Sequence, residues 1–143
     1  MSGIVLVRDL MSKDVKVVRP DTTVKEIVAT MDKFDIGSII VVQGERPVGI
    51  ITERDILRRI VEPSLDPEIM TARQVMTSPI ITISESANIE EAAKLMAKKR
   101  AKRLPVMENG RLAGMLTFTD IVFKVPAMLA LLEELVRPYR RSY

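Results

Sequence analysis

The sequence predicts a mixed α/β (α+β) fold made of two β-α-β-β-α repeats, packed sheet to sheet with pseudo-two-fold symmetry, plus a C-terminal helix. The first observation is that the stretch GIITERDI, residues 49–56, returns as GMLTFTDI, residues 114–121. The second is that the same offset of 65 runs without a gap from Arg8 to Ile60 and gives 11 identities in 53 aligned positions. A unit of about 60 residues with one small sheet is marginal alone, so the two copies are expected to share a core.

The first copy alternates between strand and helix signals. Thr23 and Glu26 form a capping-box pattern, which predicts that a helix begins there after the break at Pro20. One face of that helix is apolar at helical spacing, through Val24, Ile27, Val28, Met31 and Phe34. The complete order is a strand over 15–18, this helix, strands over 38–42 and 48–52, and a helix over 53–61.

The second copy repeats this order. Asn88 and Glu91 supply the cap, and Asn109-Gly110 is a strong hairpin-turn signal between two β-rich runs. The strands are expected over 80–83, 104–107 and 111–116.

These patterns divide the chain into repeat 1 over 5–62, a linker over 63–70, repeat 2 over 71–125, and a C-terminal helix with a basic tail over 126–143. Pro126 is expected to open the last helix, which is rich in leucine, and Pro138 to close it. The leucine stripe could dock on its own module or on another molecule. A role in a dimer is favoured, since an exposed stripe would need covering.

Composition excludes several classes of function. The chain has no His and no Cys, which removes disulfides, Cys-based metal sites, thiol nucleophiles and His acid-base catalysis. A net charge of +3 does not single out nucleic acid as a partner. No apolar run reaches the roughly 18 residues of a membrane span, and the N-terminus does not resemble a signal peptide, so a cytoplasmic protein without a membrane partner is expected.

The repeated Thr-x-x-Asp, at Thr52 to Asp55 and Thr117 to Asp120, admits two interpretations. Thr as N-cap and Asp at the third helical position would stabilise any helix. A carboxylate also has two oxygens that can accept hydrogen bonds from two vicinal hydroxyls. Recurrence at the same register, after Gly and two apolar residues, favours a ligand-binding role, and the two roles are compatible.

The order of elements, with Gly-h-h-Thr-x-x-Asp before each final helix (h, apolar), resembles a tandem pair of CBS (cystathionine-β-synthase) domains, also called a Bateman module. The resemblance covers about residues 5 to 125 and leaves no room for a catalytic domain. It implies a regulatory, non-enzymatic module that binds AMP, ADP, ATP or S-adenosylmethionine. The Asp of each motif would hold the ribose, and the Thr would lie near the ribose or phosphate.

The resemblance also implies that each cleft is completed by the other repeat. The site of Asp55 would comprise Thr52, Arg54, Asp55, Thr77, Ile80, Ile81, Ala101, Lys102 and Arg103. The site of Asp120 would comprise Thr117, Thr119, Asp120, Ser12, Val15, Lys16, Ile36, Gly37 and Ser38. No catalytic residue, metal site or catalytic cofactor is expected.

The two sites are expected to differ in charge. Lys102 and Arg103 could neutralise a phosphate at the Asp55 site, whereas their counterparts Gly37 and Ser38 carry no charge. The Asp55 site is therefore expected to prefer phosphorylated ligands. The Asp120 site is expected to be weaker, to take a less charged ligand, or to stay empty.

The resulting expectation is an adenosine-ligand sensor, a homodimer, that signals to a regulated enzyme, transporter or transcription factor. The alternative is a nucleic-acid-associated protein that uses the basic run over 98–103 and the C-terminal tail. An enzyme that pairs Asp55 with Asp120 is disfavoured, because each Asp belongs to a different cleft and a catalytic pair must converge on one substrate.

Overall fold

A computed structural model describes residues 3–140 and divides the chain into two compact units. The Asp55 unit is Val15–Ile80, and the Asp120 unit combines the residues up to Asp14 with those from Ile81 onward. Each unit has its own three-stranded sheet and its own apolar core. Within the described residues, no helix has both the length and the apolar character needed to cross a membrane.

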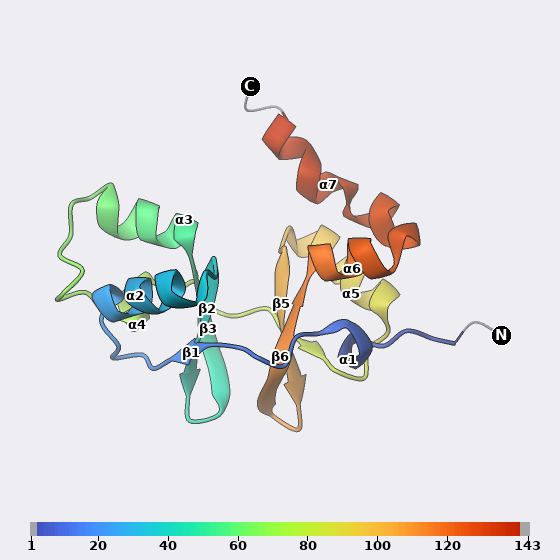
Figure 1. Cartoon of the computed structure of the whole chain (residues 1–143), viewed down its shortest axis with the longest axis horizontal. Helices are drawn as coiled ribbons and strands as arrows, with labels where there is room; N and C mark the ends of the chain where they lie inside the picture. Colours follow the sequence, from blue (N-terminus) through green and yellow to red (C-terminus); the bar gives the residue numbers. More distant parts are fainter. Residues whose placement is uncertain (1–2, 141–143) are drawn as a thin grey trace. The chain divides into compact units, whose positions relative to one another are not determined.

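The Asp55 unit carries the first copy (Figure 1). Its sheet has the order β1 (Val17–Val18), β2 (Ser38–Gln43) and β3 (Arg46–Thr52), with β1 parallel and β3 antiparallel to β2. Helix α2 (Val24–Phe34) and helix α3 (Glu53–Ile56), which continues as a π-helical turn over Leu57–Val61, lie on one face of this sheet. A short helix α4 (Ala72–Val75) follows.

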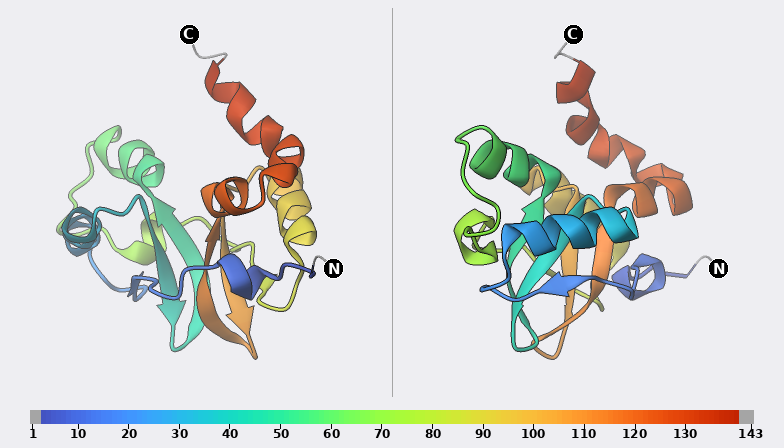
Figure 2. Two further views of the ribbon diagram at one scale, coloured as in Figure 1. Left: turned by 45° about the vertical axis from the view of Figure 1, so that its right-hand side comes forward. Right: turned by 60° about the vertical axis from the view of Figure 1, so that its left-hand side comes forward.

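The Asp120 unit repeats the arrangement (Figure 2). Its sheet has the order β4 (Ile83–Ser84), β5 (Arg103–Glu108) and β6 (Arg111–Thr117). Helices α5 (Ile89–Lys99) and α6 (Phe118–Lys124) cover one face, and the unit also holds α1 (Val7–Leu10) and α7 (Leu129–Arg140), the latter after a 3-10 turn over Pro126–Met128. The pair Val18 with Val41 returns as Ile83 with Val106, so the offset of 65 also holds for the sheet register.

Local signals account for the helix starts and the hairpins. The Thr23 hydroxyl accepts a hydrogen bond from Glu26 N at 3.3 Å, and Asn88 Oδ1 accepts one from Glu91 N at 2.8 Å. Asn109 and Gly110 both have positive φ, 51° and 79°, as a tight two-residue hairpin turn requires. Both predicted caps and the predicted turn are confirmed.

The lead-in segment of each copy, which comprises α1 and Ser12 for the first copy and α4 and Thr77 for the second, packs on the other copy. Ser12 forms an isolated bridge with Met115 on β6, and Thr77 forms the equivalent bridge with Ile50 on β3. Val7 of α1 is fully buried in the core of the Asp120 unit, as Ala72 and Val75 of α4 are in the core of the Asp55 unit. Each compact unit therefore contains one copy together with the lead-in segment of the other.

Gly49 and Gly114 make this exchange possible. A Cβ on Gly114 would lie 2.6 Å from the Ser12 carbonyl oxygen, and a Cβ on Gly49 would overlap the Met76 side chain. Each glycine also lies beside an irregularity in its hairpin, between Val41 and Val42 or between Val106 and Met107. Close packing together with a bulge explains both glycines.

Three expectations were wrong in detail. The first strand of each copy is only two residues long, because its pairing with the neighbouring strand begins later than predicted, at Val17 in β1 and at Ile83 in β4. Helix α7 does not close before Pro138 but runs to Arg140. A proline removes one backbone hydrogen bond and crowds the carbonyl four residues earlier, but its fixed φ near −65° is a helical value, and the helix continues past Pro138.

The third correction concerns the leucine stripe of α7. Leu132 and Leu135 lie in the core of the Asp120 unit with Met96 and Ile121, so this part of the stripe docks on its own module. The predicted basic tail, from Arg137, belongs to α7 as far as Arg140, and its last residue, Arg141, lies outside the described residues.

Candidate functional site

The motif of Asp55 joins β3 to α3 and is a complete capping box. Thr52 is the N-cap, and its hydroxyl accepts a hydrogen bond from Asp55 N at 3.2 Å. In return, Asp55 Oδ2 accepts from Thr52 N at 2.9 Å and from the Thr52 hydroxyl at 3.2 Å. Because the box fixes the rotamer of Asp55, its other oxygen, Oδ1, is held in a defined position.

Oδ1 of Asp55 meets two side chains of the same unit. The Thr77 hydroxyl donates to it at 3.2 Å, and Arg59 Nη2 lies 3.9 Å away. The Asp55 side chain is only 13% exposed, so this ion pair is partly shielded from water. Both oxygens of Asp55 are therefore engaged by the protein.

Arg59 also ties the lead-in segment to α3. Its Nη1 donates to the carbonyl oxygens of Val75 and Met76 at 2.9 and 2.8 Å, and its Nη2 lies 3.5 Å from the Thr77 hydroxyl. The sequence analysis missed Arg59. The only signal was its spacing of four residues from Asp55 on a helix, which on its own is typical of a weak surface pair.

The motif of Asp120 caps α6 in the same way. Asp120 Oδ2 accepts from Thr117 N at 3.0 Å, and the Thr117 hydroxyl accepts from Asp120 N at 3.3 Å. The Thr117 and Thr119 hydroxyls are 2.9 Å apart and share a hydrogen bond. Across the described part of the chain, no side chain binds Oδ1 of Asp120, and the counterpart of Arg59 at this motif is Lys124.

The capping interpretation of Thr-x-x-Asp is thus confirmed for both motifs. It does not exclude a ligand, because capping uses only Oδ2 and leaves Oδ1 for another donor. At Asp55 that donor is Thr77, from the lead-in segment.

The other predicted site residues are divided between the two units. The Asp55 unit holds Val15, Lys16, Ile36, Gly37, Ser38, Thr52, Arg54, Asp55, Thr77 and Ile80. The Asp120 unit holds Ser12, Ile81, Ala101, Lys102, Arg103, Thr117, Thr119 and Asp120. Thr77 is brought to Asp55 as the prediction requires, and Ser12 pairs with β6 close to Thr117.

The basic pair Lys102 and Arg103 lies beside the motif of Asp120 within its unit. Arg103 is the strand partner of Thr117, and the Lys102 carbonyl accepts a hydrogen bond from Phe118 N at 2.9 Å. Gly37 and Ser38 take the same places beside Thr52 and Glu53. Inside the Asp120 unit the basic pair therefore adjoins the motif of Asp120, and its predicted place at the Asp55 site stays a prediction.

No set of three or more Asp or Glu side chains within residues 3–140 is arranged to hold a metal ion. The two motifs offer carboxylates, hydroxyls and guanidinium groups, which are suited to hydroxyl and phosphate groups of an organic ligand.

Comparison with protein families places this geometry in a known context. The family model of the CBS domain matches the chain twice, over residues 7–62 and 72–127. The chain belongs to the CBS-domain family. It is a tandem CBS module, a regulatory and ligand-binding type of module that is not catalytic. The resemblance to this family that the repeated motif indicated is therefore confirmed.

The chain is similar to most of one uncharacterized protein and to a smaller part of an enzyme. The chain is 36% identical over 140 residues to the uncharacterized protein MK0525 of Methanopyrus kandleri, a match that covers 96% of this chain and 71% of that protein. It is 34% identical over 116 residues to the inosine-5'-monophosphate dehydrogenase of Methanocaldococcus jannaschii, covering 80% of this chain but only 22% of the enzyme.

A solved structure confirms the fold. The crystal structure of Hypoxic Response Protein I with two coordinated zinc ions matches with a TM-score of 0.77 and 30% sequence identity, over 85% of this chain and 99% of that one. The chain is also 31% identical over 120 residues to Hypoxic response protein 1 of Mycobacterium tuberculosis, a match that covers 83% of this chain and 84% of that protein.

Proposed function

We propose that the module binds an adenosine-containing ligand, AMP, ADP, ATP or S-adenosylmethionine, and that Asp55 and Asp120 accept hydrogen bonds from its ribose. The observation that carries the proposal is that Asp120 is fixed by its capping box through Oδ2, while Oδ1 has no partner in the described part of the chain. A carboxylate that is held rigidly with one oxygen available is pre-organised to accept a hydroxyl.

The two motifs are expected to differ in how easily their aspartate accepts a ribose hydroxyl. At Asp55 a ribose hydroxyl must compete with the Thr77 hydroxyl and must accommodate Arg59. At Asp120 it meets an oxygen that needs no displacement, with Lys102 and Arg103 in the adjoining strand region. We therefore expect the Asp120 motif to bind first, in contrast to the order expected from sequence.

Charge then favours phosphate at either motif. Arg54 and Arg59 accompany Asp55, and Lys102 and Arg103 accompany Asp120. Ligand binding would shift the module between arrangements only as far as its affinity for them differs. The change would be read by a separate enzyme, transporter or transcription factor in the cytoplasm, with the module as a homodimer.

The test is a titration of the four ligands by calorimetry and by thermal shift, on the original chain and on Asp55→Asn and Asp120→Asn. Asn keeps an acceptor for the capping N–H groups, so each variant changes the ligand oxygen with little damage to the helix start. At 100 times the Kd, bound ligand should add about 2.7 kcal/mol of stability.

We expect Asp120→Asn to weaken the tightest ligand by about tenfold or more, as the loss of a charge-assisted hydrogen bond implies, and Asp55→Asn to weaken it less. Binding that is unchanged in both variants, or no binding of any of the four ligands, would rule the proposal out. A light-scattering measurement of mass tests the homodimer independently.

A further inference from the structure

A polar cavity lies within the Asp55 unit, at the end of the sheet that is remote from Asp55. It has a volume of about 400 Å³ and lies between the residues that follow β1, the turn that joins β2 to β3, and the start of α4. Figure 1 shows this turn at the opposite end of the strands from the start of α3. Along β2, Gln43 at the cavity is roughly 17 Å from Ser38, which pairs with Thr52. The cavity is therefore separate from the candidate site of Asp55.

Two arginines make this cavity basic. Arg19 and Arg73 both line it, and neither guanidinium has an ion-pair or hydrogen-bond partner among the described residues. Asp21, the acidic residue of the lining, forms no ion pair with either arginine. The lining thus presents two unpaired cations and a single carboxylate.

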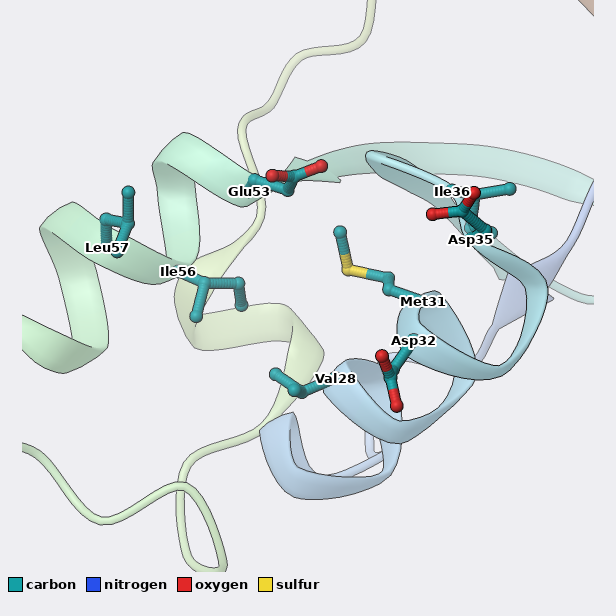
Figure 3. Close-up of a pocket in the computed structure, with 8 residues that line it drawn as sticks. All are labelled: Val28, Met31, Asp32, Asp35, Ile36, Glu53, Ile56 and Leu57. Atoms are coloured by element: carbon teal, nitrogen blue, oxygen red, sulfur yellow. The ribbon is translucent and has the colours of Figure 1, made fainter.

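The basic character of this cavity is not shared by the whole unit. Figure 3 shows a hollow between α2 and α3 of the same unit, where Asp32, Asp35 and Glu53 lie beside apolar side chains. A small anion would be repelled by these carboxylates and attracted to the cavity of Arg19 and Arg73.

In the second copy, the equivalent arginine has an anion supplied by the chain. At the offset of 65, Arg73 corresponds to Arg8. The backbone is equivalent, because Arg73 N donates to the Pro20 carbonyl at 2.9 Å and Arg8 N donates to the Glu85 carbonyl at 3.0 Å. Arg8 Nη1 lies 3.9 Å from Oε2 of Glu85, whose side chain is only 15% exposed. Glu108 forms a hydrogen bond with the same carboxyl group.

Most of the charge differences between the copies make this place more positive in the Asp55 unit. Two of them remove a carboxylate and one adds a cation: Glu85 becomes Pro20, Glu108 becomes Gln43, and Ser84 becomes Arg19. One difference acts against them, since Asp21 takes the place of Ser86. The Asp55 unit thus keeps the arginine, adds a second one, and lacks the two carboxyl groups found beside the arginine of the other unit.

We propose that Arg19 and Arg73 bind a small anion that carries two carboxylate or phosphate groups, in the place that Glu85 and Glu108 take in the other unit. A guanidinium offers a planar fork of donors that matches either group. Cavities of about 300 Å³ or more are large enough for small-molecule ligands. The proposal involves neither the Thr-x-x-Asp motifs nor a nucleoside, so its failure would leave the proposed function untouched.

The test begins with titration of the full chain, without nucleotide and at constant ionic strength, with succinate, pyrophosphate and the uncharged succinamide. Calorimetry should show saturable binding of succinate or pyrophosphate and none of succinamide. The tighter of the two anions identifies whether carboxylate or phosphate is preferred. In NMR spectra, the backbone amide signals of Gln43, Gly44 and Thr71 should shift, and those of Thr52 and Asp55 should not.

Variants that remove a charge locate the site. Arg19→Ser, which copies Ser84, and Arg73→Gln should each weaken the anion by about tenfold or more. Arg58→Gln is the matched control, because Arg58 is exposed in the same unit but does not line the cavity, and it should change the affinity by less than about twofold.

Asp21→Asn tests the sign of the charge that the cavity prefers. Its carboxylate opposes an anion, so the variant should bind about threefold more tightly. Equal or weaker binding in this variant would contradict the proposal.

A sharper variant adds the missing carboxylate and keeps both arginines. Pro20→Glu copies Glu85, which occupies the same turn: Thr22 N donates to the Arg19 carbonyl at 3.1 Å, and Ala87 N donates to the Ser84 carbonyl at 3.1 Å. The new carboxylate should compete for Arg73 and weaken the anion by about tenfold. Pro20→Gln has the same size without the charge and should bind within about threefold of the original chain. A thermal melt of each variant confirms that it folds.

The proposal is overturned if neither anion binds saturably, or if both arginine variants bind as well as the original chain. It is also overturned if Pro20→Glu and Pro20→Gln bind equally. Amide shifts confined to Thr52 and Asp55 would assign the anion to the Thr-x-x-Asp motif and would likewise exclude a site at Arg19 and Arg73.

Discussion

Arg59 is the single side chain that most clearly distinguishes the Asp55 motif from its copy. It binds two backbone carbonyls of the lead-in segment and lies near Asp55, whereas Lys124 holds the equivalent position at Asp120. An ammonium cannot reproduce this, because only the planar guanidinium has a fixed fork of donors.

Arg59→Gln is expected to lower the free energy of unfolding by about 1–3 kcal/mol, since two hydrogen bonds from a charged donor are lost. Lys124→Gln is the matched control and should change stability by less than about 0.5 kcal/mol. Urea denaturation of both variants measures the difference. Equal losses in the two variants would show that Arg59 does not hold the lead-in segment.

A second residue-scale difference is a pair of carboxylates in the Asp120 unit. A hydrogen bond from Glu108, followed by burial, raises the pKa of Glu85 above its usual value, while Arg8 opposes the shift. In the Asp55 unit the counterparts are Pro20 and Gln43, which cannot share a proton in this way.

The raised pKa gives a stability that depends on pH. Because the folded state holds the proton more tightly, the contribution is complete below the unfolded pKa of Glu and is lost as pH rises through the raised folded pKa. Glu108→Gln, which copies Gln43, should therefore remove this loss. Thermal melts from pH 4 to pH 7 should show the Tm of the variant rising relative to the original chain, and parallel curves would contradict the assignment.

At the scale of elements, the two lead-in segments are packed through glycines that are not equally replaceable. A Cβ on Gly114 would meet the backbone oxygen of Ser12, which is fixed by the bridge to Met115. A Cβ on Gly49 would meet Met76, mainly its thioether and side-chain carbons, which can move.

Gly114→Ala is accordingly expected to cost about 3 kcal/mol, at the upper end for overpacking, and Gly49→Ala about 1 kcal/mol. Chemical denaturation of the two single variants gives the comparison directly. Should Gly49→Ala prove the more harmful, Met76 would have to be more rigid than the Ser12 backbone.

The sequence predicts those elements whose cause is local. The caps at Thr23 and Asn88 and the turn at Asn109-Gly110 need only neighbouring residues, and all three are present. Helix α7 could be located but not its C-terminus or its docking surface, because Pro138 near a helix end does not break the helix and leucine spacing does not identify its partner.

The candidate site was predictable only where a pattern in the sequence marks its residues. Thr-x-x-Asp is visible as a repeat, and Thr77 follows from the resemblance to the family. Arg59 acts through backbone carbonyls distant in sequence, which leave no pattern. The neighbours of Lys102 and Arg103 depend on strand pairing within the unit, which the offset between copies alone does not give.

At the scale of the whole molecule, the repeats in the sequence and the compact units in space have different boundaries. The family model matches 7–62 and 72–127, but the Asp55 unit extends through Ile80 and the Asp120 unit takes in the residues before Val15. Each copy thus contributes a buried segment to the core that belongs to the other. This exchange links the stability of either unit to residues that sequence comparison assigns elsewhere.

Val75→Ala and Val7→Ala test this exchange reciprocally in the intact chain. Both valines are fully buried, Val75 in the Asp55 unit and Val7 in the Asp120 unit, and each truncation should cost roughly 2 kcal/mol. Hydrogen exchange should then accelerate mainly in β2 and β3 for Val75→Ala, and mainly in β5 and β6 for Val7→Ala. Each variant is the control for the other. If Val7→Ala instead loosened β2 and β3, the lead-in segments would stabilise their own copies, and the boundaries between the units would follow the repeats.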